Sequence, residues 1–108
     1  MDMVKELIKH IEHKGKSKIE IAVLHCEVES DQAIFYMSCY LESGCYKEVC
    51  LDLLEGENLS CDDTNVILRY NDLVKKCANI LTNEHNVEFR SIGIYDYKTL
   101  YEKYYKFN

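Results

Sequence analysis

The chain has 108 residues, of which 47% are hydrophobic and 30% are charged, and its formal net charge is −6. This length and composition predict one globular domain over residues 1–108 and argue against a disordered chain or a fold that depends on disulfides. The longest apolar runs, residues 21–24 and 33–37, are too short to cross a bilayer, so we expect no membrane contact. The N-terminal residues lack the apolar segment of a secretion signal, which predicts a cytoplasmic protein.

The first elements expected along the chain are one helix and three strands. Apolar residues recur at helical spacing over residues 3–13, which predicts an amphipathic helix that Gly15 ends. Three segments rich in β-branched and aromatic side chains then predict strands, at residues 18–28, 33–41 and 45–53. The polar segments between them are short, as hairpin loops are, and they predict an antiparallel meander.

A second amphipathic helix is the strongest structural signal in the chain. Its wide apolar stripe consists of Val66, Ile67, Tyr70, Leu73, Val74, Cys77, Ile80 and Leu81. Ser60 and Asp63 are spaced as a capping box before it. A fourth strand is expected over residues 87–95, and the change of its apolar phase predicts a bulge near Arg90 and Ser91. The aromatic segment 98–107 predicts a short terminal helix.

The resulting order, α-β-β-β-α-β-α, predicts an α+β domain in which the first two helices pack on one face of an antiparallel meander sheet. The loop at residues 42–44 implies a register in which Phe35 lies opposite Leu51 and Ala33 lies opposite Leu53. The other hairpin adds alternate residues of the first strand to the same face, so that both loops predict one apolar, core-facing surface.

The opposite face of the sheet is expected to carry tyrosines among carboxylates. Its predicted residues are Ile21, Val23, His25, Glu27, Ile34, Tyr36, Ser38, Tyr40, Tyr46, Glu48, Cys50 and Asp52. A sheet face in water normally carries small polar or charged side chains, so this composition predicts a cover. We consider two covers, the C-terminal segment of the same chain and a second protein.

The residue patterns give little support for a catalytic site or a metal site. The six cysteines lack close metal-ligand pairs, and we interpret most of them as small hydrophobes of the core. His25 and Cys50 fall in one cross-strand row, but two residues separated by a whole strand lie about 10 Å apart, beyond the reach of a nucleophile and its base. His10 and His13 lack a further ligand, and no phosphate-binding loop or catalytic motif is present. We therefore expect a protein that is not an enzyme and that uses no cofactor and no metal.

Negative charge is concentrated in the middle of the chain. Residues 27–72 contain eleven carboxylates against Lys47 and Arg69, a net charge of −9, whereas both flanking segments are mildly basic. This distribution favours steering toward a basic partner and disfavours direct binding of nucleic acid. Because tyrosine is a frequent interface anchor, we predict these partner-binding residues: Tyr36, Tyr40, Tyr46, Glu48, Asp52, Glu55, Glu57, Asp62 and Asp63.

These patterns predict a small acidic interaction module that binds and inhibits, or sequesters, a basic partner such as a nucleic-acid-binding protein. In its small, acidic, stand-alone design the chain resembles phage-encoded anti-defence inhibitors, such as anti-CRISPR proteins, and immunity proteins. Its element order is also similar to that of class I secretion chaperones, with one strand fewer. The alternative is a small-molecule or metal-binding α+β domain, in which the sheets of a homodimer enclose a pocket.

Overall fold

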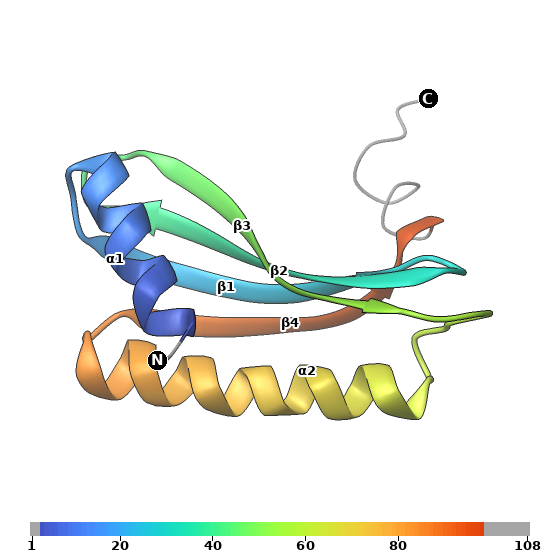
Figure 1. Cartoon of the computed structure of the whole chain (residues 1–108). Coiled ribbons are helices and arrows are strands. Elements are labelled where there is room, and N and C mark those ends of the chain that lie inside the picture. Colours follow the sequence, from blue (N-terminus) through green and yellow to red (C-terminus); the bar gives the residue numbers. More distant parts are fainter. Residues whose placement is uncertain (1–2, 99–108) are drawn as a thin grey trace.

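The computed structural model describes residues 3–98 (Figure 1). Its elements are α1 (Met3–Gly15), β1 (Ile19–Val28), β2 (Gln32–Leu41), β3 (Tyr46–Glu55), α2 (Thr64–Cys77), the π-helical η1 (Ala78–Glu84) and β4 (Glu88–Asp96). The predicted order of elements is confirmed over this range. The terminal helix expected at residues 98–107 lies, except for its first residue, outside the described part of the chain.

The four strands form one mixed sheet in the order β3-β2-β1-β4. β1, β2 and β3 make the predicted antiparallel meander, but β4 pairs with β1 in parallel, so the expectation of a purely antiparallel sheet is wrong. The cause is the long connection through α2 and η1. This connection returns the chain to the end of the sheet at which β1 begins. β4 therefore runs in the same direction as β1, as a helical crossover allows.

The register of the first hairpin places alternate residues of β1 and β2 on one buried face. Cys26 lies opposite Phe35 and Leu24 opposite Met37, and all four side chains are buried, which confirms the predicted core face of this hairpin. In the second hairpin the predicted register fails beyond Cys50. Tyr36 pairs with Cys50 but Phe35 pairs with Asp52, because a bulge leaves Leu51 as an extra residue in β3.

This bulge exchanges the two faces of β3 for the rest of the strand. Asp52 and Leu54 therefore lie on the side of the helices, while Leu53 lies on the other side with 44% of its surface exposed. The predicted bulge in β4 is confirmed. Leu24 pairs with Ser91 and His25 with Gly93, which leaves Ile92 as the extra residue.

The second helix begins three residues later than the predicted capping box implied. Asp63, and not Ser60, is its N-cap, and the Asp63 carboxylate accepts hydrogen bonds from the backbone N–H groups of Asn65 and Val66 at 2.9 and 3.2 Å. These contacts satisfy donors that a helix N-terminus leaves without partners.

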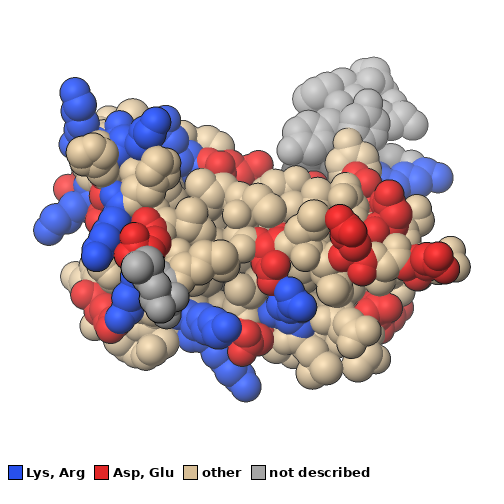
Figure 2. Space-filling model, viewed as in Figure 1, with Lys and Arg blue, Asp and Glu red and all other residues tan. Residues whose placement is uncertain are grey.

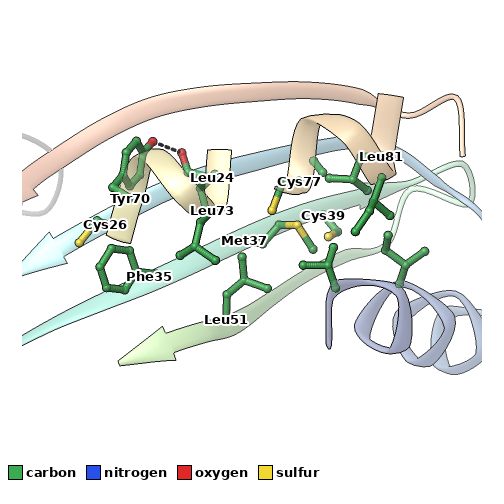
Figure 3. Close-up of a cluster of buried hydrophobic side chains, with 14 of the residues drawn as sticks. Leu24, Cys26, Phe35, Met37, Cys39, Leu51, Tyr70, Leu73, Cys77 and Leu81 are labelled. Carbon is green, nitrogen blue, oxygen red and sulfur yellow. Dashed lines mark hydrogen bonds between the residues drawn. The ribbon is translucent and has the colours of Figure 1, made fainter. Parts of the chain in front are cut away.

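Both helices contribute side chains to the same hydrophobic core as the sheet (Figure 3). α1 buries Val4, Ile8 and Ile11, and α2 buries Val66, Tyr70, Leu73 and Cys77 of the predicted stripe. Ile67 of that stripe is 36% exposed, and Ile80 and Leu81 are buried in η1, not in α2. Cys26, Cys39 and Cys77 are buried and form no disulfide within residues 3–98, which confirms the interpretation of Cys39 and Cys77 as small core hydrophobes. Both helices and one face of the sheet therefore contribute to the core. The other face of the sheet is called the open face below.

Candidate protein-interaction surface

The strand register orders the side chains of the open face in rows across β3, β2 and β1. From one end of the strands to the other, the rows are Tyr46, Tyr40 and Ile21; Glu48, Ser38 and Val23; Cys50, Tyr36 and His25; and Leu53, Ile34 and Glu27. The face thus combines aromatic and aliphatic side chains with carboxylates. β4 adds Arg90, the one cation that the described residues place on this face, and Arg90 is in an ion pair with Glu88.

Tyr40 and Tyr46 form an exposed aromatic pair at one end of the open face. Their ring centroids lie 5.1 Å apart, with an angle of 54° between the ring planes, and the residues are 47% and 48% exposed. The Tyr46 hydroxyl lies 3.0 Å from Glu48 Oε2 and 3.1 Å from Ser38 Oγ. Burial and the neighbouring Glu48 carboxylate raise the pKa of Tyr46, so its hydroxyl remains a hydrogen-bond donor.

The middle of the open face contains a second aromatic contact, between His25 and Tyr36. The two rings are stacked with their centroids 5.2 Å apart, and His25 Nε2 lies 3.4 Å from Glu27 Oε1. Burial, followed by the nearby carboxylates, raises the pKa of Tyr36. The thiol of Cys50 donates to the carbonyl oxygen of Asp52 at 3.4 Å. Cys50 is therefore directed along its own strand.

A cluster of carboxylates occupies the opposite end of the strands. The acidic end, as we call it, consists of Glu29, Asp31, Glu55, Glu57, Asp62, Asp63 and Asp96. Two backbone hydrogen bonds hold its loops together, from Gly56 N to the Asp31 carbonyl at 3.1 Å and from Leu59 N to the Ser30 carbonyl at 2.9 Å. Asp96 joins it because β4 runs beside β1 and pairs Asp96 with Val28.

Lysines are frequent at the other end of the molecule, where α1 lies, with carboxylates among them (Figure 2). Lys16 and Lys18 follow α1, and the 42–44 loop is fixed beside them by hydrogen bonds from Glu42 N to the Lys18 carbonyl at 2.9 Å and from Ser43 N to Ser17 Oγ at 2.9 Å. The strands separate the two ends. At about 3.3 Å per residue, the length of β3 places them roughly 30 Å apart.

The structure divides the nine predicted partner-binding residues into three groups. Tyr36, Tyr40, Tyr46 and Glu48 share the open face, and Glu55, Glu57, Asp62 and Asp63 share the acidic end. Asp52 belongs to neither, because the β3 bulge directs it toward α2, where its Oδ2 pairs with Arg69 Nη1 at 2.5 Å. Its predicted place on the open face is wrong.

Sequence reasoning missed three members of the acidic end, Glu29, Asp31 and Asp96. They come from a loop and from a strand end that are far from residues 55–63 in the chain. The concentration of carboxylates over residues 27–72 was a signal for the first two, but it did not show which of them meet in space. Asp96 had no such signal, because only the parallel pairing of β4 with β1 brings it there.

The depressions found among residues 3–98 do not include the centre of the open face. Three surface depressions, of about 440, 340 and 200 Å³, are lined by other residues than His25, Tyr36 and Cys50. The depression of about 440 Å³ lies between α1, α2 and β3, where Asp52 pairs with Arg69 and Asp72 with Lys76. Within residues 3–98, no three His, Cys, Asp or Glu side chains are grouped to hold a metal ion. No helix in this range has the length and apolar character needed to span a membrane.

Fold and surface together define the class of the protein, an α+β domain with a four-stranded mixed sheet, a tyrosine-bearing open face and separated charges. Comparison of the chain with protein-family models, curated proteins and solved structures gives no match.

Proposed function

We propose that the chain is an interaction module that binds a basic protein through its acidic end and the adjoining open face, and thereby inhibits or sequesters that protein. The observation that carries this proposal is the separation of charge. Seven carboxylates from three separate parts of the chain meet at one end of the strands, and Lys98 is the single Lys or Arg that the described residues place in these segments.

Electrostatics explain why such an arrangement suits a binding protein. Like charges that are crowded together repel one another, so a cluster of carboxylates does not favour folding. The same cluster attracts a basic surface, raises the rate of encounter and selects against acidic competitors. Exposed side chains of the open face, such as Tyr40, Tyr46 and Leu53, offer apolar contacts of the kind found in the centre of interfaces.

The test compares two triple variants with the same change in net charge. Asp31→Asn, Glu55→Gln and Glu57→Gln neutralise three exposed carboxylates of the acidic end. The matched control, Glu6→Gln, Glu20→Gln and Glu42→Gln, neutralises three exposed carboxylates elsewhere. A tagged full-length chain captures its partner from lysate at two salt concentrations, and the association rate of the purified partner is then measured.

We expect a basic partner whose association with the unmodified chain slows as salt increases. The acidic-end variant should associate about tenfold more slowly at low salt, and the control should change little. An acidic partner, or equal rates for the two variants, would contradict the proposal.

A further inference from the structure

Glu48 is a carboxylate held in a defined position by two hydroxyl groups. Its Oε2 lies 3.0 Å from the Tyr46 hydroxyl and 3.4 Å from Ser38 Oγ, and both hydroxyls are donors to it. Glu48 forms no ion pair with any cation of residues 3–98, although Lys14 and Lys47 border the same small depression. Its other oxygen, Oε1, makes no hydrogen bond within that range and remains available as an acceptor.

Two aromatic rings lie beside this carboxylate. Tyr46 lies directly across from Tyr40 in the neighbouring strand, and Glu48 is the next open-face residue of β3 after Tyr46. About half of the surface of each tyrosine is exposed, and the two ring planes make an angle of 54°. The rings therefore present two exposed aromatic faces at an angle to each other. A cation is stabilised when it lies over the face of such a ring within about 6 Å of its centroid.

We infer that Tyr40, Tyr46 and Glu48 form a receptor for one arginine side chain of the basic partner. An arginine fits this arrangement better than a lysine. Its flat guanidinium group stacks on an aromatic ring while its N–H groups donate in the ring plane to a carboxylate, whereas an ammonium group offers charge without a stacking plane. The Tyr46 hydroxyl and Ser38 hold the Glu48 carboxylate before the arginine arrives, which reduces the loss of side-chain entropy on binding.

The inference rests on the proposed function in one respect only, because it assigns the arginine to the basic partner. The receptor lies at the opposite end of β3 from Glu55 of the acidic end. Its binding of arginine is therefore measurable independently of the acidic end.

The experiment uses three blocked pentapeptides that differ only in a central arginine, lysine or citrulline, with the full-length chain observed by NMR. We expect the arginine peptide to shift the ring signals of Tyr40 and Tyr46 and the side-chain signals of Glu48. The lysine peptide should bind at least threefold more weakly. Citrulline, which has the shape of arginine without its charge, should cause no shift. Equal shifts from all three peptides, or none from arginine, would overturn the inference.

Three substitutions separate the parts of the receptor. Glu48→Gln removes the charge and Tyr40→Leu removes a ring, and each should weaken arginine-peptide binding at least fivefold. Tyr46→Phe retains the ring but removes the hydroxyl that holds Glu48, and should weaken binding about threefold. Glu6→Gln and Tyr97→Phe are matched controls at exposed positions outside the receptor, and they should bind the peptide normally. Backbone NMR spectra verify that each variant is folded.

Partner binding then distinguishes the two proposals. If Glu48→Gln and Tyr40→Leu leave the affinity for the basic partner unchanged while the acidic-end variant reduces its association rate, the receptor is wrong and the proposed function stands. If the acidic-end variant binds the basic partner normally and binding of the arginine peptide still depends on Glu48, the proposed function is wrong and the receptor stands as an arginine site.

Discussion

At the scale of single residues, burial controls the chemistry of the cysteines. Cys26 and Cys39 are completely buried on the core face of the sheet, and loss of solvation raises the pKa of each thiol from 9.0 to about 12. Cys45 and Cys50, in contrast, are exposed. Because the thiolate is the reactive form of cysteine, we expect the buried and the exposed thiols to differ in reactivity.

Alkylation should therefore distinguish the two sets of thiols. In the folded chain at mildly alkaline pH, iodoacetamide should modify Cys45 and Cys50, and should modify Cys26 and Cys39 at least tenfold more slowly. Peptide mapping by mass spectrometry measures the extent of reaction at each site. Denatured protein provides the control, since all six cysteines should then react. Rapid modification of Cys39 in the folded chain would contradict its burial.

The raised thiol pKa values also have a consequence for stability. A thiol that holds its proton in the folded state but releases it in the unfolded state favours unfolding as the pH rises. Cys26 and Cys39 should thus contribute a loss of unfolding free energy between about pH 9 and about pH 12. Urea unfolding across this range should show a shallower decline in a Cys26→Ala, Cys39→Ala variant, and an unchanged slope would argue against the contribution.

At the scale of elements, one side chain joins α2 to both parallel strands. Tyr70 is buried, with 5% of its surface exposed. Its hydroxyl lies 3.1 Å from the Leu24 carbonyl of β1 and 2.5 Å from Ser91 Oγ of β4. The hydroxyl also accepts a hydrogen bond of 2.9 Å from the backbone N–H of Gly93. This glycine follows the β4 bulge and has a φ of 108°, which side chains rarely permit.

Tyr70→Phe should destabilise the fold without changing the size of the ring. Removal of the hydroxyl leaves the Gly93 N–H and Ser91 without this partner, and we expect a loss of about 1–3 kcal/mol in the free energy of unfolding. Urea denaturation measures the change. Tyr95→Phe is the control, because the Tyr95 hydroxyl donates a hydrogen bond of 2.7 Å to the Ile92 carbonyl in an exposed position. Equal losses for the two variants would show that Tyr70 does not hold the bulge.

At the scale of the whole molecule, the charges of residues 3–98 are unevenly distributed. The acidic end and the lysines around α1 lie at opposite ends of the strands (Figure 2). Clustered like charges repel in the folded state and separate on unfolding, so the acidic end should lower stability in the absence of a partner.

Neutralisation of the acidic end should consequently stabilise the isolated chain. The triple variant Asp31→Asn, Glu55→Gln, Glu57→Gln should gain about 0.5–1 kcal/mol of unfolding free energy at low salt. The gain should decrease at high salt, where exposed charges are screened. Thermal unfolding at two salt concentrations measures it, with the Glu6, Glu20 and Glu42 variant as the control. A loss of stability would indicate that these carboxylates make favourable contacts in the fold.

Local patterns in the sequence were sufficient for the elements and most of the core. Apolar periodicity located both helices, and the loops at residues 29–32 and 42–44 located the hairpins, because these signals arise from neighbours in the chain. The change of apolar phase also revealed the β4 bulge. The β3 bulge produced no comparable signal, since Leu51 to Leu54 contains three leucines and fits either register.

The sequence by itself determined which segments are helices and strands, which side chains can form a core, and that negative charge is concentrated along the chain. Only the tertiary structure decided the face on which Asp52 lies, the parallel pairing of β4, and the meeting of Asp31, Glu57 and Asp96 at one end. The physical reason is the range of the interactions. Periodicity and turn chemistry act between residues close in sequence, whereas strand pairing and charge clustering join residues that only the folded chain brings together.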